Sequence, residues 1–269
     1  MRYITIEQEN LLFELMKKCG FIVAQAHNEA SVADTITEKS GTANFVTAFD
    51  VRVQNMLITE IKSVFPSAGF VAEEKENGAE DISEGLYFVI DPIDGTTNFI
   101  HDYKSSSISV GILYNGVPVF GAVYDPYKDE LFSAYVGEGA FCNGKKISVS
   151  DRPLSLALVG FGTSPYYKDE LADNAFALAK ELFVACSDIR RGGSAAIDLC
   201  AVACGRMDAF FEQKLSPWDF MASYVIVTEA GGALLNFKGE PVSFACPDNI
   251  ICTNAVSRDD VIKITSKYM

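Results

Sequence analysis

The sequence predicts a mixed α/β fold, and three observations carry that prediction. An uninterrupted apolar run over residues 86–90 has the length and composition of a buried strand. Asn115-Gly116, set between two β-rich segments, is typical of a two-residue hairpin turn. The second half then alternates short apolar runs with segments of helical periodicity. A chain of 269 residues with 49% hydrophobic content can bury one large core, so we expect residues 1–269 to form a single domain.

The elements follow in order from periodicity and turn residues. Apolar residues at helical spacing predict a helix within the first thirty residues. Residues 28–44 are polar, and Lys39-Ser40-Gly41 marks a loop within them. Further helices are expected near residues 50–64, 171–183, 194–204 and 220–229. Further strands are expected near residues 107–113, 117–124, 130–135, 156–160, 209–211, 233–235 and 250–253.

Composition narrows the possible partners and location. The formal net charge of −14 and the pI near 4.6 argue against a general nucleic-acid-binding protein and against adhesion to anionic membranes, since both need a basic face. Seven cysteines without framework spacing read as reduced thiols of a cytoplasmic protein. We find no secretory signal pattern near the start and no apolar stretch of membrane-spanning length.

The segment Asp91-Pro92-Ile93-Asp94-Gly95-Thr96-Thr97-Asn98 is the most informative part of the chain. It delivers two carboxylates at the carboxyl end of the strand predicted over residues 86–90, with a turn expected from Pro92 to Gly95. Gly95-Thr96-Thr97 can open a helix whose free amides face the same spot. Carboxylates that hold hard cations beside an anion-binding helix end suit Mg²⁺-assisted phosphate-ester chemistry. Taken alone, the segment is equally compatible with an ordinary turn.

Two further acidic segments favour a metal site over an ordinary turn. Glu73-Glu74 follows the short apolar stretch 70–72, although such a pair is more often a solvated face. Asp219 follows Trp218 and precedes an apolar helical pattern, so its simplest reading is a helix N-cap.

Taken together, these motifs resemble the inositol monophosphatase family of Mg²⁺-dependent phosphatases, and most closely its inositol-1-monophosphatases. The resemblance rests on Glu73-Glu74, on DPIDGTTN, and on Trp218-Asp219 with a helix ending in EAGG. It extends to VTAFD from Val46, to residues 137–150 and to GGSAAIDLC from Gly192. It implies the α-β-α-β-α sandwich also found in fructose-1,6-bisphosphatase, a Mg²⁺ cofactor, lithium sensitivity and a homodimer.

The resemblance also implies the metal ligands. Glu73, Asp91 and the backbone carbonyl of Ile93 are expected to bind one Mg²⁺. Asp91, Asp94 and Asp219 are expected to bind a second, and a third, looser ion again uses Glu73. Ligands that are all oxygen fit Mg²⁺.

The catalytic expectation is a relay from an attacking water through the Thr96 hydroxyl to Asp50. Both residues also have a structural reading as helix caps. Glu74 is expected to support the metal-bound water, and Lys39 to steady phosphate or metal-bound water from a mobile loop.

Substrate recognition is expected to centre on Glu212, which lies where the inositol phosphatases carry a glutamate that accepts hydrogen bonds from sugar hydroxyls. Its structural reading is an exposed acid at a strand end. The substrate-binding residues expected with it are Asp94, Gly95, Thr96, Gly193, Ser194 and Ala195, the last three beginning a helix with its amides and the Ser194 hydroxyl available to the substrate.

The sequence therefore predicts a phosphatase acting on inositol monophosphate, a small phosphate monoester. Fructose 1,6-bisphosphate and NADP or another nucleotide stay open as substrates, because Arg190, Arg191 and Arg206 could receive a second phosphate. An alternative of another class is a regulatory module that binds without turnover, which the complete set of expected catalytic residues disfavours.

Overall fold

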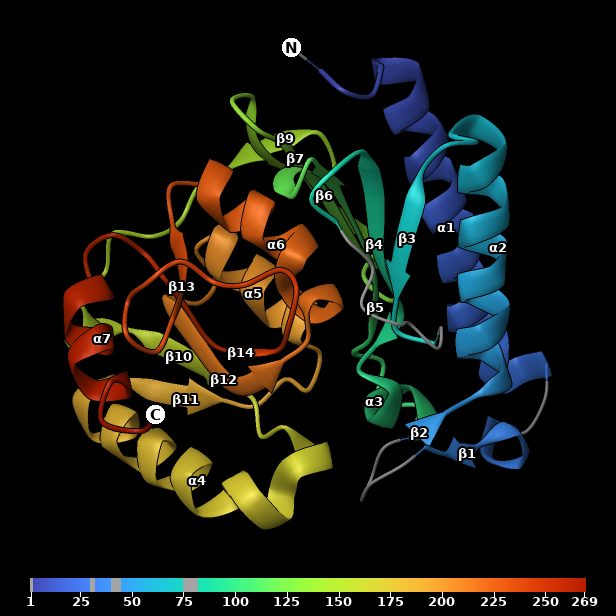
Figure 1. The fold of residues 1–269 in the computed structure, drawn as a ribbon. Coiled ribbons are helices and arrows are strands. Elements are labelled where there is room, and N and C mark those ends of the chain that lie inside the picture. Colours follow the sequence, from blue (N-terminus) through green and yellow to red (C-terminus); the bar gives the residue numbers. More distant parts are fainter. Residues whose placement is uncertain (1, 30–31, 40–44, 75–81) are drawn as a thin grey trace.

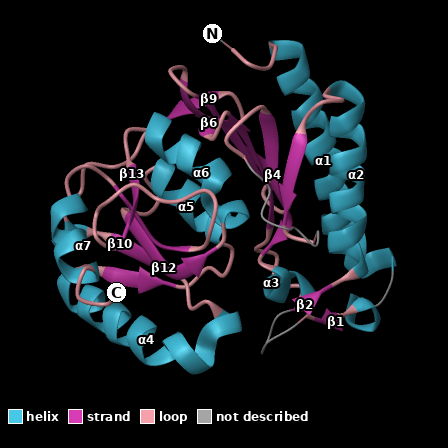
Figure 2. Ribbon diagram, in the orientation of Figure 1, coloured by secondary structure: helices cyan, strands magenta, loops and turns pink. Residues whose placement is uncertain are grey.

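The computed structural model describes residues 2–29, 32–39, 45–74 and 82–269, and they form five layers (Figure 1). Two long helices cover a seven-stranded sheet, two helices lie between that sheet and a five-stranded one, and two more cover the outer face of the second sheet (Figure 2). The layered α-β-α-β-α arrangement is the one that the family resemblance implies.

The first two layers are built on the N-terminal half of the chain. Helices α1 (Ile6–Glu29) and α2 (Ala48–Val64) pack their apolar faces on the sheet, burying Met16 and Leu57 against Phe88 and Phe120. The sheet runs in the order β3 (Gly69–Ala72), β4 (Leu86–Asp94), β5 (Ser107–Tyr114), β6 (Val117–Asp125), β7 (Glu130–Tyr135), β8 (Gly139–Cys142) and β9 (Lys145–Ile147). Strands β3 and β4 are parallel and the other neighbours are antiparallel.

The C-terminal half forms the remaining layers. The central helices are α5 (Ala195–Ala203) and α6 (Pro217–Glu229), and the outer helices are α4 (Lys168–Ala185) and α7 (Arg258–Thr265). The second sheet runs in the order β11 (Asp188–Arg190), β10 (Leu158–Phe161), β12 (Ala209–Leu215), β14 (Asp248–Thr253) and β13 (Ala233–Asn236). Short elements complete the chain: a 3₁₀ turn at Val32–Thr35, the hairpin of β1 (Thr37–Glu38) and β2 (Phe45–Val46), helix α3 (Thr96–Ile100), and 3₁₀ turns at Leu154–Leu156 and Pro165–Tyr167.

Several predicted elements are confirmed. The first helix is present, and Asn115 and Gly116 form the hairpin between β5 and β6 with φ angles of 49° and 75°. Of the loop predicted at Lys39-Ser40-Gly41, Ser40 and Gly41 lie outside the described residues.

Other boundaries were wrong, and each has a local cause. Helix α2 begins at Ala48 and α6 at Pro217, both earlier than predicted, because the caps are Thr47 and Ser216. Strand β12 extends four residues beyond the predicted end, to Leu215. The strand predicted over residues 156–160 begins at Leu158, because a 3₁₀ turn occupies Leu154–Leu156.

Strand β4 does not end where the sequence suggested. It continues through Pro92 to Asp94, and its pairing with β5 shifts register between Asp91 and Asp94. The predicted turn at Pro92–Gly95 is therefore wrong, since an irregularity of the strand replaces a reversal of the chain. Pro92 has no backbone N–H, and it is tolerated here because the irregular pairing between β4 and β5 does not require a hydrogen bond from this residue.

We predict that Gly121→Ala destabilises the protein, because β6 meets α6 backbone to backbone at this glycine. An added methyl carbon would lie 2.0 Å from the Ala222 carbonyl oxygen, and neither main chain can move without separating the sheet from the helix. Overpacking of this kind costs about 1–3 kcal/mol, which urea denaturation would measure. An unchanged unfolding midpoint would contradict the close approach of β6 and α6.

Candidate active site

A cavity of about 580 Å³ lies between the two halves of the molecule, where the end of β4 meets the beginnings of α5 and α6. Its lining includes most of the residues predicted from sequence: Lys39, Glu73, Asp91, Ile93, Asp94, Gly95, Thr96, Arg191, Gly193, Ser194, Ala195, Glu212 and Asp219. The two others, Asp50 and Glu74, contact lining residues from behind. The fold thus brings together side chains spread over 180 positions of the sequence, from Lys39 to Asp219.

The irregular end of β4 sets the direction of its carboxylates. Asp91 is buried, and its Oδ1 accepts a hydrogen bond from the Ile93 amide at 3.0 Å. Gly95 then ends the strand with φ 87°, a conformation that favours glycine. A Cβ there would also approach the Gly193 carbonyl to 2.9 Å, so this glycine permits the two halves to meet.

Asp94 links the end of β4 to the start of α5. Its carboxylate accepts hydrogen bonds from the Ala195 amide at 3.2 Å, the Ala196 amide at 2.9 Å and the Ser194 hydroxyl. Ser107 on β5 adds a longer contact of 3.4 Å. In this structure the Ser194 hydroxyl and the first amides of α5 therefore bind Asp94, and their availability to a substrate stays a prediction.

Asp50 and Asp219 occupy equivalent places on two helices. Each is the third residue of its helix and accepts from the backbone N–H of the hydroxyl residue that caps it: Thr47 N at 2.8 Å and Ser216 N at 2.7 Å. They belong to capping boxes and are not themselves the N-caps that the sequence suggested. Negative side chains are favoured at these helix starts.

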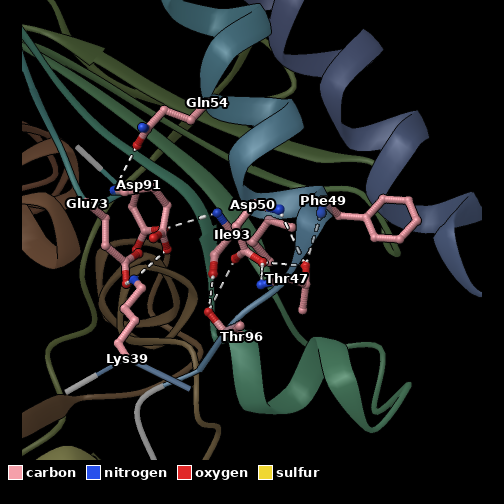
Figure 3. Close-up of polar contacts among 10 residues, drawn as sticks. Lys39, Thr47, Phe49, Asp50, Gln54, Glu73, Asp91, Ile93 and Thr96 are labelled. Atoms are coloured by element: carbon pink, nitrogen blue, oxygen red, sulfur yellow. Dashed lines mark hydrogen bonds and ion pairs between the residues drawn. The ribbon is translucent and has the colours of Figure 1, made fainter. Parts of the chain in front are cut away.

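Thr96 lies between the cavity and Asp50 (Figure 3). Its hydroxyl is 3.4 Å from Asp50 Oδ1 and 3.2 Å from the Ile93 carbonyl oxygen, so its single proton has two acceptors. Thr96 is the first residue of α3, and the N-cap is Gly95. Burial raises the pKa of Asp50 to about 6, against the opposing effect of the hydrogen bonds from Thr47.

Lys39 reaches the acidic cluster from the β1 side (Figure 3). Its ammonium lies 2.6 Å from Glu74 Oε1 and 3.2 Å from Glu73 Oε1. The Glu74 amide donates to Gln54 Oε1 at 2.9 Å, which fixes the backbone directly after β3. Glu74 is thus a buried partner of Lys39 and not a solvated surface acid.

The four acidic side chains predicted as metal ligands are destabilised in their charged form. Burial is the largest cause that raises the pKa of Glu73, Asp91, Asp94 and Asp219. Repulsion from neighbouring acids adds to it for Glu73, Asp91 and Asp219, and the pKa values of the two aspartates lie well above the ordinary range. For Asp94, the hydrogen bonds from the start of α5 oppose the effect of burial on the pKa. The contact between Glu73 and Asp91 lowers the pKa of Glu73 and raises that of Asp91.

These observations fit a cation site. Within the part of the chain that the structure describes, no three His, Cys, Asp or Glu side chains converge closely enough to hold an ion as they stand. Instead, the Lys39 ammonium offsets part of the negative charge. Mg²⁺ prefers oxygen ligands, and such an ion would offset the remaining charge of these carboxylates.

The opposite wall of the cavity holds a second acidic group. Glu212 is 8% exposed and lies within β12, so its reading as an exposed acid at a strand end is wrong. Its Oε1 accepts from the Ser164 amide at 2.9 Å. Burial raises the pKa values of both Glu212 and Asp198 to about 7, and the charge on Asp94 adds to each shift.

Only one of the three candidate arginines belongs to the cavity. Arg191 lines it and lies 3.3 Å from the Thr163 hydroxyl. Arg190 pairs with Asp188, and Arg206 forms a two-pronged pair with Glu130 at 2.6 and 2.5 Å. Neither of these two lines the cavity, so the expectation that they receive a second phosphate is wrong.

The sequence analysis missed Tyr166, Tyr167, Asp198 and Lys214, which also line the cavity. The two tyrosines follow Ser164-Pro165 in a 3₁₀ turn after β10, a segment without a motif. Asp198 lies one turn into α5, and its sequence pattern there is that of an ordinary helical residue.

We predict that the metal-free protein loses stability as the pH rises from about 5 to 7. The pKa values of Asp50, Asp198 and Glu212 are about 6, 7 and 7 in the fold, above the ordinary carboxyl range. The native state therefore binds more protons than the unfolded state in this window, so its stability is fully present at lower pH and is lost as the pH passes through these values. Urea midpoints measured in EDTA would show the decline, and Asp198→Asn would reduce its slope. Midpoints that rise over this range would contradict the assigned burial.

A sequence profile of the inositol monophosphatase family matches residues 7–269. Among curated proteins, the chain is 37% identical to inositol monophosphatase 1 of Bos taurus over 257 residues, covering 93% of this chain and 90% of that protein. It is 35% identical over 230 residues to a protein of Pasteurella multocida named Nus factor SuhB, covering 86% of this chain and 85% of that protein.

The fold is similar to solved structures as well. The crystal structure of extragenic suppressor protein suhB from Bartonella henselae superimposes with a TM-score of 0.88 at 30% identity, covering 97% of this chain and 99% of that one. The matches therefore include relatives named for an enzyme activity and relatives named as Nus factors.

Proposed function

The chain belongs to the inositol monophosphatase family of phosphatases, and from that premise we propose that it hydrolyses inositol monophosphate to inositol and phosphate. The observation that carries the proposal is the pairing, in one cavity, of a buried carboxylate cluster with a separate buried glutamate, Glu212. The cluster suits the phosphate end of such a substrate, and the glutamate suits its hydroxyl groups.

In this proposal Glu73, Asp91 and the Ile93 carbonyl would hold one Mg²⁺. Asp91, Asp94 and Asp219 would hold a second, and Glu73 would also serve a third, loosely held ion. When bound, Mg²⁺ supplies a Lewis acid for the phosphate oxygens and lowers the pKa of a nearby water. The buried position of these side chains supports the assignment, because a cation offsets the repulsion that raises their pKa values.

Thr96 and Asp50 form the proton path of the proposal. The Thr96 Oγ1 accepts a proton from the attacking water and passes its own to Asp50 Oδ1, which lies 3.4 Å away. Asp50 suits this role because burial holds its pKa at about 6, closer to neutrality than an ordinary aspartate. Glu74 and Lys39 hold each other in place beside Glu73 and orient the groups around the phosphate.

On the substrate side, one oxygen of Glu212 accepts from the Ser164 amide, which leaves the other for an inositol hydroxyl. Asp94, Gly95, Thr96, Gly193, Ser194 and Ala195 surround the same space. Arg191 favours a second candidate, a substrate with another anionic group such as NADP or fructose 1,6-bisphosphate. Of the three arginines considered, it is the one that lines the cavity, and the other two are paired with acids outside it.

The proposal extends to a cytoplasmic homodimer without a nucleic-acid partner. The seven cysteines are free thiols, which supports a reducing compartment, while the homodimer rests on the family resemblance. Because one relative is named a Nus factor, binding of a nucleic acid by the wild type is the result that would contradict this part of the proposal. Among the described residues, no helix is long and apolar enough to cross a membrane.

We predict that Asp94→Asn abolishes most Mg²⁺-dependent phosphate release while the protein stays folded. Asparagine keeps the volume and an oxygen that can accept from the α5 amides, but it removes the negative charge. Phosphate release would be measured against Mg²⁺ concentration, with Li⁺ expected to inhibit the wild type. The control is Asp151→Asn, which removes an exposed carboxylate outside the cavity. Wild-type activity in Asp94→Asn would refute the metal assignment.

We predict that Glu212→Gln weakens action on inositol 1-phosphate more than on a small aryl phosphate. The glutamine oxygen can still accept from the Ser164 amide, so the loop keeps its anchor while the charge that receives the inositol hydroxyl is lost. Loss of a hydrogen bond to a charged group is worth on the order of 1.5–3 kcal/mol, or roughly a ten- to hundredfold drop in kcat/KM. Equal losses of kcat/KM on both substrates would show that Glu212 organises the whole site. An unchanged kcat/KM on both would favour fructose 1,6-bisphosphate or NADP as the natural substrate.

A further inference from the structure

Tyr166 lines the same cavity as the carboxylate cluster, and the proton relay and the Glu212 contact leave it without a role. It is carried by the 3₁₀ turn Pro165–Tyr167, between β10 and α4. Its side chain is 38% exposed, yet its hydroxyl makes no hydrogen bond within the described residues. An unpartnered donor thus faces a cavity that contains groups suited to a phosphate.

The turn that carries Tyr166 is fixed at both ends. Ser164 has a left-handed backbone with φ 43°, and it is tied to β12 because its amide donates to Glu212 and its hydroxyl to the Gln213 carbonyl. The Tyr167 amide closes the turn on the Ser164 carbonyl at 2.8 Å.

The far end of the turn is held by Lys214. The Lys214 ammonium lies 4.6 Å from the centre of the Tyr167 ring and binds both Glu170 oxygens at 2.8 Å. These contacts fix the backbone of the turn, and a fixed backbone limits the positions that the Tyr166 side chain can take before substrate arrives.

Tyr166 shares its cavity with Glu73, Asp91, Asp94 and Asp219, the four side chains proposed to bind the metal. Partial burial of the ring and then the charges of these four carboxylates raise the pKa of this phenol, which agrees with their common place in the cavity. An ordinary phenol is protonated at neutral pH, so its hydroxyl can donate a hydrogen bond to a phosphate bound beside them.

We propose that Tyr166 is a substrate-contacting residue whose hydroxyl donates a hydrogen bond to the phosphate group of the substrate. The inference rests on the proposed phosphatase function and adds a donor that closes the site from the C-terminal half of the molecule. A fixed donor that meets negative charge without having to reorganise stabilises a phosphoryl group during its transfer.

Tyr166→Phe tests the proposal because it removes the hydroxyl and keeps the ring. The readouts are kcat/KM for inositol 1-phosphate and for a small aryl phosphate, and the Kd of inorganic phosphate measured by calorimetry in Mg²⁺. We expect both kcat/KM values to fall by a similar factor, roughly ten- to hundredfold, and phosphate binding to weaken, since both substrates share the phosphate. The control is Tyr103→Phe, an exposed tyrosine outside the cavity, which should match the wild type.

Two outcomes overturn the inference alone. A loss confined to inositol 1-phosphate would mean that Tyr166 contacts the organic half of the substrate, and unchanged values in an active enzyme would mean that it contacts neither part. A wild-type protein that neither hydrolyses phosphate esters nor binds phosphate would overturn the proposed function and this inference together.

Discussion

The structure depends on keeping several carboxyl groups together in a buried cavity between two sheets. Like charges repel more strongly in such a place than they do in bulk water. The fold meets this constraint by setting acids at helix starts: Asp50 on α2, Asp219 on α6, and Asp94 against the first amides of α5. The partial positive charge of each helix start then offsets part of the repulsion.

The same constraint explains why the layers are arranged as they are. The seven-stranded sheet contributes Asp91 and Asp94 from the end of β4, while the central helices contribute Ser194 and Asp219 from their first turns. Neither half holds a complete site, so the site depends on close contact between them. Gly95 and Gly121 allow that contact, since a Cβ at either position would collide with the facing backbone.

The fold class and most of the cavity lining could be predicted from sequence, because local motifs mark them. Asn115-Gly116 specifies a hairpin through its own backbone preferences, and the family motifs carry the acids in a fixed order. The errors arose where a distant contact decides the outcome. Glu212 was predicted to be an exposed acid at a strand end. Its contact with the Ser164 amide, 48 positions away in the sequence, could not be seen in the local pattern. The irregular end of β4 likewise depends on pairing with Ser107 on β5.

The contact between Glu212 and Ser164 joins two functions that sequence motifs treat separately. The glutamate that is proposed to receive a sugar hydroxyl also anchors the turn that carries Tyr166, which is proposed to contact the phosphate. Gly162 makes room for this arrangement, because a Cβ there would lie 1.9 Å from the Glu212 carboxyl group. A change at Glu212 that removes its oxygens is therefore expected to release this turn and to remove the proposed hydroxyl acceptor, whereas glutamine separates the two effects by keeping the anchor. Under these two proposals, substrate selection and phosphate contact are coupled through one buried side chain.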